Sequence, residues 1–340
     1  MTPETASISV APSPVPVPDA MIEKLLSAPR VVIVSHVKPD GDAFGSTLAL
    51  AHLLQNAGRN AIVVGLEPVA PSYQFLTQTQ PILPAAEYLP QEGDLFAVCD
   101  CGSPDRLPGP LQVFLEKLPS VSIDHHKTNS GFGDVSYVDP SASSTAELIW
   151  RIARKAGWPL DQASATALWV GVVTDTGRFA YDNTTPETLE FAADLLRQGQ
   201  LSTAEVNEQV YGNVPEAQLR LQARAIDSLQ RSPDGRVALI SLARSDYDAC
   251  GAAGTDSENF VNLPRSLRGV TVAGLLYEGD QPDQTRLSLR SRPPYDASLF
   301  CSRHGGGGHA RAAGATLDIP ISEARQSILR ELTAWLDSHI

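Results

Sequence analysis

Four short, mostly apolar runs limit most strongly what this chain can fold into. They lie at residues 31–35, 61–65, 95–100 and 121–124. Runs this short and rich in β-branched residues are typical of strands buried on both faces of a parallel sheet. Between the first two runs, residues 46–56 have helical periodicity that ends before Gly58, which indicates a strand–helix–strand unit. The chain therefore predicts an α/β fold with a mainly parallel sheet flanked by helices.

The rhythm of the sequence changes near residue 230, which indicates a second domain. Helices are expected over 146–156 and 161–173 and onward from Thr185 and Ser202, which are typical N-cap residues. After the turn Pro233-Asp234-Gly235, strands are expected over 237–242, 270–277 and 285–291, followed by a helix over 322–338. We predict a catalytic domain over 20–212, a connecting helix over 213–232 and a smaller C-terminal α/β domain over 233–340. Residues 1–19 contain five prolines, and we expect them to form a disordered tail.

Composition narrows the class of protein. The 26 Lys and Arg residues against 39 Asp and Glu residues give a net charge of −13, so we expect no long nucleic acid as a partner. A hydrophobic content of 42% excludes an intrinsically disordered chain, and four scattered cysteines do not make a disulfide framework. No apolar run reaches the roughly 18 residues of a membrane helix and no signal peptide is visible, so we expect a cytoplasmic protein without a membrane partner.

Acidic and imidazole side chains gather where the predicted first-domain elements end. They are His36, Asp40, Asp42, Asp100, Asp124, His125, His126 and Asp175. Because ligands in open α/β sheets bind at the carboxyl ends of the strands, we expect these side chains to form one site. Carboxylate oxygens with a few imidazoles suit Mn²⁺ or Mg²⁺, whereas structural Zn²⁺ sites favour thiolates. The number of candidate ligands is enough for two ions about 3.5–4 Å apart.

Each cluster also has a plainer interpretation. The turn over 36–42 could cap the following helix, and Asp100 and Asp175 could be ordinary loop residues. The adjacent His125 and His126 are harder to explain structurally, because they follow a predicted buried strand in a chain with only seven histidines. Cys99 and Cys101, on either side of Asp100, are interpreted as core residues.

A glycine-rich segment marks the second domain. Gly305, Gly306, Gly307 and Gly308 lie between His304 and His309. Exposed backbone amides there could bind a phosphate, or the segment could be a flexible linker. Upstream, Arg290 and Ser291 end a predicted strand, and the cation could bind a phosphate or be a solvated surface residue.

In this order, the motifs resemble the DHH phosphoesterase superfamily. The pattern is His36-x-x-x-Asp40-x-Asp42, then Asp100, Asp124-His125-His126 and Asp175. The glycine segment, followed by Ala312-Ala313-Gly314, looks like the superfamily's C-terminal DHH-associated substrate-binding domain. The resemblance covers nearly all of the chain beyond the tail and is closest to the branch of nanoRNases and 3′-phosphoadenosine-5′-phosphate phosphatases. The chain has four glycines where many relatives have three.

The resemblance implies a role for each residue. His36 and Asp40 would bind one Mn²⁺, while Asp42, His125 and Asp175 would bind a second and Asp100 would bridge the two; Mg²⁺ or Co²⁺ could replace Mn²⁺. Asp124 would orient the imidazoles, and His126 would contact the scissile phosphate or help the leaving oxygen depart. The terminal phosphate or base of a short substrate would be bound by Arg290, Ser291, Asn262, Gly305, Gly306, Gly307, Gly308 and His309.

The reaction implied is hydrolysis of phosphoesters at two metal ions that activate a bridging water. The substrates would be oligoribonucleotides of a few residues and 3′-phosphoadenosine 5′-phosphate, which loses its 3′-phosphate. Cleavage of cyclic dinucleotides or their linear products is the enzymatic alternative, since that branch shares every metal motif. A sensor that binds a nucleotide without hydrolysing it is the non-enzymatic alternative. The superfamily also suggests a homodimer, although no sequence feature by itself indicates one.

Overall fold

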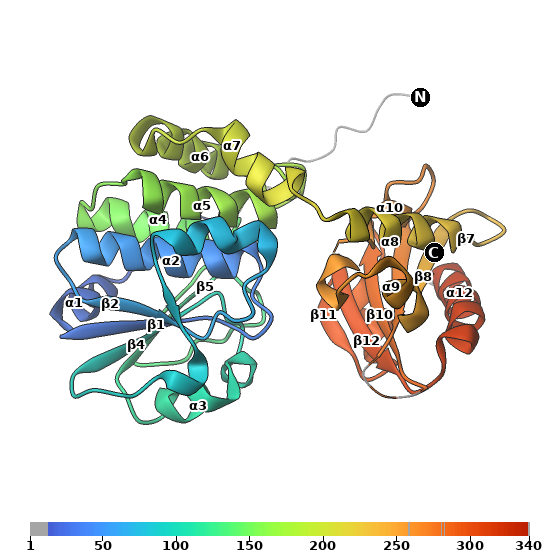
Figure 1. Cartoon of the computed structure of the whole chain (residues 1–340), viewed down its shortest axis with the longest axis horizontal. Coiled ribbons are helices and arrows are strands. Elements are labelled where there is room, and N and C mark those ends of the chain that lie inside the picture. Colours follow the sequence, from blue (N-terminus) through green and yellow to red (C-terminus); the bar gives the residue numbers. More distant parts are fainter. Residues whose placement is uncertain (1–12, 258, 280, 282, 339–340) are drawn as a thin grey trace. The chain divides into compact units, whose positions relative to one another are not determined.

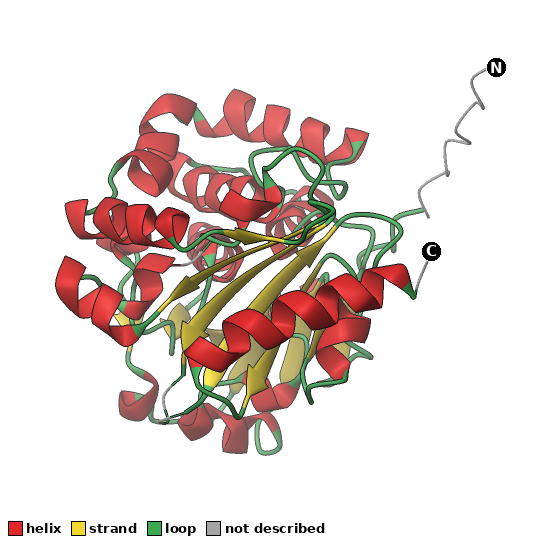
Figure 2. Ribbon diagram, turned by 90° about the vertical axis from the view of Figure 1, so that its right-hand side faces the viewer, coloured by secondary structure: helices red, strands yellow, loops and turns green. Residues whose placement is uncertain are grey.

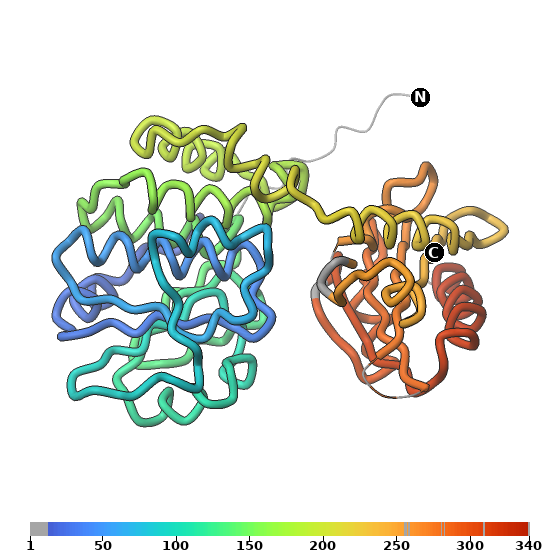
Figure 3. Tube along the Cα trace, in the orientation of Figure 1, coloured from blue at the N-terminus to red at the C-terminus, as the bar shows by residue number. Residues whose placement is uncertain are grey.

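The computed structural model describes residues 13–257, 259–279, 281 and 283–338, so the part of the predicted tail at 1–12 lies outside it. The chain divides into two compact units, Met1–Asn213 and Val214–Ile340. In the backbone trace of Figure 3 the chain passes once from the first unit to the second. Within the described ranges, no helix has the length and apolar content needed to cross a membrane.

A six-stranded parallel sheet is the centre of the first unit. Its order is β3-β2-β1-β4-β5-β6, and every neighbouring pair runs parallel. The strands are β1 (Arg30–Val34), β2 (Ala61–Val64), β3 (Ile82–Leu83), β4 (Asp94–Cys99), β5 (Ser120–Asp124) and β6 (Val135–Val138). The four predicted strands are confirmed. The edge strands β3 and β6 were not predicted, because one has two residues and the other is half-exposed, so neither makes a continuous apolar run.

Helices cover both sides of the strands (Figure 2). Those of the first unit are α1 (Asp19–Ser27), α2 (Gly41–Asn56), α3 (Gly109–Leu115), α4 (Thr145–Ala156), α5 (Gln162–Asp175), α6 (Pro186–Gly199) and α7 (Thr203–Asn207). Figure 1 shows α2 between the sheet and the layer formed by α4 and α5. This position explains why α2 is buried from Gly41 to Leu54, since a helix packed on both sides has little surface left for water.

Two glycines allow α2 and α5 to pack closely. A Cβ atom on Gly45 would lie 2.5 Å from the carbonyl oxygen of Ala167 in α5. A Cβ atom on Gly171 in α5 would lie 2.7 Å from Oδ1 of Asp42, near the start of α2. These distances are shorter than any real Cβ contact, so the crossing of the two helices requires residues without a side chain here.

The structure corrects the prediction that all of residues 1–19 form a disordered tail. Val17 is 9% exposed and belongs to the main core of the first unit, and α1 begins at Asp19. The backbone N–H of Val15 donates a hydrogen bond to Oδ2 of Asp139, 2.9 Å away. The prolines around these valines prevent regular helix or sheet, but they do not prevent an extended segment from packing against a folded domain.

The second unit has a mixed sheet. Its order is β11-β12-β10-β9-β8-β7, in which β8 and β9 are parallel and the other neighbours are antiparallel. The strands are β7 (Gln230–Arg231), β8 (Val237–Leu242), β9 (Val272–Glu278), β10 (Thr285–Ser291), β11 (Gly307–His309) and β12 (Ala312–Leu317). The helices are α8 (Glu216–Asp227), α9 (Arg244–Cys250), α10 (Asn262–Arg265), α11 (Ala297–Ser302) and α12 (Ile321–Asp337).

The predicted connecting helix is part of the second unit. Leu221 and Ala225 of α8 are buried in the same cluster as Ile240 and Leu242 of β8. The strand β7, which also falls within the predicted connection over 213–232, pairs with β8. The sequence signal at Pro233-Asp234-Gly235 therefore marks a hairpin inside the second unit rather than its beginning.

Candidate metal centre

The acidic and imidazole side chains of the first unit meet where the order of the sheet changes direction. Strands β2 and β3 extend the sheet from one side of β1, and β4, β5 and β6 extend it from the other side. A crevice forms at the carboxyl ends of the two central strands in such a sheet. His36 comes two residues after β1, Asp100 directly follows β4, and β5 ends at Asp124. The topology thus explains why residues so far apart in sequence share one site.

The amino end of α2 holds two of the predicted ligands. Asp40 is the N-cap of α2, and its Oδ1 accepts hydrogen bonds of 3.1 Å from the N–H groups of Asp42 and Ala43. The helix therefore begins five residues earlier than predicted, because Asp40 caps it. Asp40 therefore caps the helix, as the alternative interpretation of this turn predicts. This does not exclude a metal site, since Oδ2 of the same carboxylate does not take part in the cap.

The described residues contain three groups of side chains that could each hold a metal ion. They are His36, Asp40 and Asp100; Asp42, His125 and Asp175; and Asp100, His125 and His126. In each group the candidate ligand atoms lie within 4.8 Å of one another. The first two groups match the two predicted ligand sets.

Asp100 belongs to the first group and also approaches the second. Its Oδ2 is 3.6 Å from Nε2 of His36, and its Oδ1 is 3.8 Å from Nε2 of His125. Nε2 of His125 also lies 3.4 Å from Oδ2 of Asp175 and 3.9 Å from Oδ2 of Asp42. A single carboxylate with one oxygen toward each group can bridge a pair of neighbouring cations.

His36 and His125 both present Nε2 to the acidic side chains. Nδ1 of His36 lies 2.8 Å from the carbonyl oxygen of Val37, and Nδ1 of His125 lies 3.3 Å from that of Ala142. A hydrogen bond of this kind fixes the ring and leaves Nε2 as the ligand, as is usual for metal-binding histidines. The residues therefore fit divalent metal ions in their chemistry and in their orientation.

Burial and crowding change the acidity of these carboxyl groups. Burial, together with the charges of Asp100 and Asp175, raises the pKa of Asp42 well above its usual range. Burial raises the pKa of Asp175 to about 7, although the nearby His125 opposes the shift. For Asp100 burial acts in the same direction, but the nearby imidazoles of His36 and His125 hold its pKa below the usual range. A bound cation would stabilise the charged forms of these crowded carboxyl groups.

The backbone of α4 supports the buried Asp42. The N–H groups of Thr145 and Ala146 donate to its two oxygens at 2.6 and 2.9 Å. The hydroxyl of Thr145 donates to Oδ1 of Asp100 at 2.9 Å. Sequence reasoning missed Thr145, although Ser144 and Glu147 form the start of a recognisable helix-capping pattern. The amino end of α4 therefore contacts two of the candidate ligands at once.

Asp175 ends α5 in front of an unusual backbone segment. Gly177, Arg178 and Phe179 have φ angles of 57°, 62° and 63°. Left-handed backbone costs a non-glycine residue roughly 1–2 kcal/mol. The Thr176 hydroxyl accepts a hydrogen bond from the Phe179 N–H at 3.0 Å, which helps hold this turn. Strained backbone of this kind is often found next to functional sites.

The side chains of Asp124 and His126, predicted to be catalytic, contact each other. Nδ1 of His126 lies 2.7 Å from Oδ1 of Asp124, which is buried. Burial would lower the pKa of His126, but the hydrogen bond to Asp124 and the charge of Asp100 raise it to about 9. Asp124 is in none of the three metal-binding groups. It contacts His126, as the prediction requires.

In the second unit, Arg290 and Asn262 lie on the same face of the sheet. Leu287 and Leu289 of β10 are buried in the core cluster that contains α12, so the alternate residue Arg290 points to the opposite face. On that opposite face Leu263, next to Asn262 in α10, packs in the cluster that contains α8. Oδ1 of Asn262 is buried and has no hydrogen-bond partner, so it could accept a hydrogen bond from a ligand.

The glycine segment is not a free loop. The N–H groups of Gly305 and Gly306 bond to the carbonyl oxygens of Ser302 and Cys301 at the end of α11. The residues Gly307–His309 form β11, which pairs with β12 at the edge of the sheet. A Cβ atom on Gly306 would lie 2.1 Å from a carbonyl oxygen of β12 and one on Gly308 2.6 Å from another. The glycines thus allow close strand packing, which the sequence alone did not reveal.

Ser291 also has a structural contact. Its hydroxyl oxygen lies 2.8 Å from the carbonyl oxygen of Tyr295 and 2.7 Å from that of Ala310, and its single hydrogen can be donated to either. These bonds tie β10 to the segment that follows β11. The Ser291 side chain is buried, so a direct contact with substrate would need this hydroxyl to change partners.

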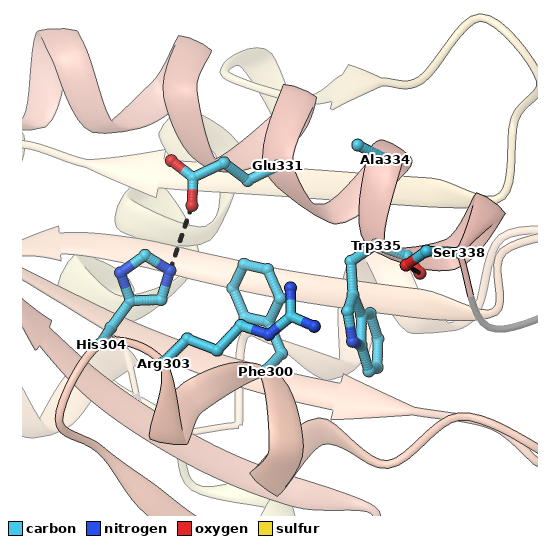
Figure 4. Close-up of a pocket in the computed structure, with 7 residues that line it drawn as sticks. All are labelled: Phe300, Arg303, His304, Glu331, Ala334, Trp335 and Ser338. Atoms are coloured by element: carbon cyan, nitrogen blue, oxygen red, sulfur yellow. Dashed lines mark hydrogen bonds and ion pairs between the residues drawn. The ribbon is translucent and has the colours of Figure 1, made fainter.

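Figure 4 shows a pocket of the second unit between α11 and α12. In it, Nε2 of His304 lies 3.2 Å from Oε2 of Glu331, and the rings of Phe300 and Trp335 meet edge to face. The seven described residues that line it include none of the predicted substrate-binding residues. It belongs to the face of the sheet opposite Arg290.

Comparisons with known proteins establish the family. The pattern described as "DHH family, N-terminal domain" matches residues 30–172, and that of the "DHHA1 domain" matches residues 247–338. The bifunctional oligoribonuclease and PAP phosphatase NrnA of Thermus thermophilus is 34% identical over 312 residues, which cover 91% of this chain and 91% of that protein. The chain belongs to the DHH family. The resemblance and the predicted fold class are thereby confirmed.

Other relatives of this DHH-family chain also match it over most of its length. The bifunctional oligoribonuclease and PAP phosphatase NrnA of Bacillus subtilis is 29% identical over 84% of this chain and 89% of that protein. The cyclic-di-AMP phosphodiesterase PdeA of Listeria monocytogenes is 27% identical over 93% of this chain, but the match covers only 49% of PdeA. A crystal structure of an exopolyphosphatase-related protein from Bacteroides fragilis superposes with a TM-score of 0.86, at 27% identity, over 93% of this chain and 95% of that one.

Proposed function

We propose that this DHH-family protein is a metal-dependent phosphoesterase that hydrolyses very short oligoribonucleotides to mononucleotides and removes the 3′-phosphate of 3′-phosphoadenosine 5′-phosphate. The observation that carries the chemistry is Asp100, which has one oxygen toward each of two groups of candidate ligands. The choice of substrates is supported by the relatives from Thermus thermophilus and Bacillus subtilis, which are named as oligoribonucleases and PAP phosphatases.

Six residues would hold the metal ions. His36 and Asp40 would bind one ion, Asp42, His125 and Asp175 the other, and Asp100 both. Mn²⁺ suits this set of carboxylates and imidazoles, and Mg²⁺ or Co²⁺ could occupy the same positions. When bound, two such ions activate a water molecule and neutralise the negative charge that develops on a phosphate.

The remaining residues would act on the substrate directly. Asp124 holds the ring of His126 through Nδ1, so Nε2 is the nitrogen that can approach the scissile phosphate or donate a proton to the leaving oxygen. In the second unit, Arg290, Asn262, Ser291 and the segment from Gly305 to His309 would bind the terminal phosphate or base. For Ser291 we propose support of this segment, given the bonds of its hydroxyl. The expected homodimer stays a prediction, which the molar mass in solution would test.

A substrate comparison tests this function. Purified protein with Mn²⁺ is incubated with end-labelled RNAs of two to five nucleotides, an RNA of about twenty-four nucleotides, 3′-phosphoadenosine 5′-phosphate and a cyclic dinucleotide, each with a chelator control. We expect chelator-sensitive hydrolysis of the short RNAs and of the bisphosphate, with the long RNA spared because the net charge of −13 disfavours a long polyanion. Nucleotide binding without turnover would favour the sensor.

The second candidate function is hydrolysis of cyclic or linear dinucleotides. The similarity to the cyclic-di-AMP phosphodiesterase PdeA favours it, because that similarity extends over 93% of this chain. That match covers only 49% of PdeA, however, whereas the matches to the proteins named as oligoribonucleases extend over most of both chains. In the same assay, cleavage of the cyclic dinucleotide alone would support this alternative.

A further inference from the structure

Asn129 joins the ends of two central strands beside the candidate metal centre. It is 8% exposed and follows β5 in the chain. Its Nδ2 donates to Oδ2 of Asp124 at 2.7 Å and to the carbonyl oxygen of Cys101, just beyond β4, at 3.3 Å. Its Oδ1 accepts from the N–H of Gly131 at 2.8 Å. With acceptors on one side of the amide and a donor on the other, only one orientation of this side chain satisfies all three contacts.

This orientation constrains Asp124. One oxygen of the Asp124 carboxylate accepts from Asn129 and the other lies 2.7 Å from Nδ1 of His126. Asp124 is 1% exposed, so no solvent shell holds the carboxylate in place of Asn129. Nδ1 of His126 is also 3.7 Å from Oδ1 of Asp100, which places two carboxylates around this nitrogen. Carboxylates only accept hydrogen bonds, so Nδ1 carries a hydrogen.

We propose that Asn129 is a positioning residue for catalysis, which fixes the Asp124 carboxylate so that this carboxylate orients the His126 ring through Nδ1. Asn129 itself would touch neither substrate nor metal. The inference rests on the proposed phosphoesterase function for its kinetic consequence, but the geometry of Asn129, Asp124 and His126 can be tested without turnover. A partner of this kind is typically worth 10- to 100-fold in activity, by analogy with the residues that orient metal-bound histidines.

The first test reads the hydrogen bond itself. Proton NMR of the metal-free protein should show a downfield imidazole N–H resonance that is protected from exchange and is lost in His126→Gln. In Asn129→Ala, and in Asn129→Asp, which keeps an acceptor for Gly131 but puts a second carboxylate beside Asp124, this resonance should move upfield or exchange rapidly. An unchanged resonance in both Asn129 variants would overturn the proposal.

The matched control is Ser122→Ala. Ser122 is buried in β5 and its hydroxyl donates to the carbonyl oxygen of Phe132 at 2.8 Å, so it supports the same loop without touching Asp124. The control should retain the resonance and the activity. If Ser122→Ala has the same effect as Asn129→Ala, general loosening of the loop explains both and the positioning role is refuted.

The second test is kinetic. On a short RNA, Asn129→Ala should lower kcat about 10- to 100-fold, with KM and the affinity for Mn²⁺ changed less than about twofold. In a His126→Ala background the same substitution should have no further effect, because Asn129 acts through His126. Multiplicative losses in the double variant would contradict the proposal. If the wild-type protein hydrolyses none of the substrates, the proposed function fails while the NMR test still decides the role of Asn129.

Discussion

The ion pair at the amino ends of β1 and β4 allows a quantitative prediction for Asp94→Asn. Asp94 has a fully buried side chain, and its two oxygens accept hydrogen bonds of 2.7 Å from Nε and Nη2 of Arg30, whose side chain is 13% exposed. Tyr88 and the N–H of Gln91 also donate to it at 2.8 Å. Removal of one partner of a buried ion pair costs about 3–5 kcal/mol. Because Arg30 keeps some access to water, we expect a loss of about 3 kcal/mol.

Tryptophan fluorescence can follow this loss. Three of the four tryptophans, Trp150, Trp158 and Trp169, lie in the first unit, so thermal or denaturant unfolding read by fluorescence mainly reports that unit. A loss of about 3 kcal/mol should lower its Tm by roughly 6–12 °C. Below the transition, activity should be unchanged, because Asp94 and the candidate ligand Asp100 are at opposite ends of β4.

Asp134→Asn is the control for Asp94→Asn. Its ion pair with Lys24 has side chains that are 51% and 34% exposed, so its loss should cost less than about 1 kcal/mol. A loss for Asp94→Asn no larger than that of the control would refute the reasoning.

The sign of the pH dependence gives a second check. Burial alone would raise the pKa of Asp94, but the hydrogen bonds from Arg30 hold it below its usual value. The stability gained from Asp94 is therefore present above about pH 4 and lost as the pH falls further, so the gap between wild type and variant should close in acid.

Three predictions concern the metal centre. Gly171→Ala should weaken Mn²⁺ binding at least about 10-fold in calorimetric titration, since its Cβ would lie 2.7 Å from Oδ1 of Asp42; unchanged affinity would show that this carboxylate is not a ligand. Thr145→Val should lower activity roughly 10-fold by removing the 2.9 Å hydrogen bond to Asp100, with circular dichroism as the check on the fold; full activity would contradict this. With the metal chelated, stability should fall as the pH rises from about 4 to about 7, because the folded-state pKa of Asp175, about 7, lies above its unfolded value. Thermal scans should show a smaller fall in stability for Asp175→Asn, and Mn²⁺ should reverse the fall in the wild type. The same dependence of Tm on pH in variant and wild type would refute the assignment.

Local patterns were enough to predict most of the regular elements. The four central strands were recognisable because a strand buried on both faces needs a short, mostly apolar run, and each has one, although Ser122 interrupts that of β5. The N-caps at Thr185 and Ser202 were recognisable because their side chains bond to backbone N–H groups only three residues away. In both cases the physical cause lies within a few residues of the chain.

Elements that depend on distant partners were missed or misjudged. Val17 looks like part of a proline-rich tail until the core of the first unit is formed around it. The segment from Gly305 to His309 looks like a loop because its glycines have no apolar pattern, whereas in the fold they let β11 approach β12. Neither feature leaves a local periodicity to detect.

The sequence by itself determined which candidate ligands are present and their order along the chain. His36, Asp100 and the Asp124-His125-His126 motif each follow an apolar run, and carboxylates with imidazoles already indicate a divalent metal. Only the tertiary structure decided how these groups act together. Adjacent strands β1 and β4 bring Asp100 close to two groups of candidate ligands, backbone carbonyl oxygens lie against Nδ1 of His36 and His125 and leave Nε2 toward the acidic side chains, and Asn129 donates a hydrogen bond to Asp124. The physical reason is that the ligand chemistry belongs to single residues, whereas distances and ring orientations come from strand order and from contacts between distant parts of the chain.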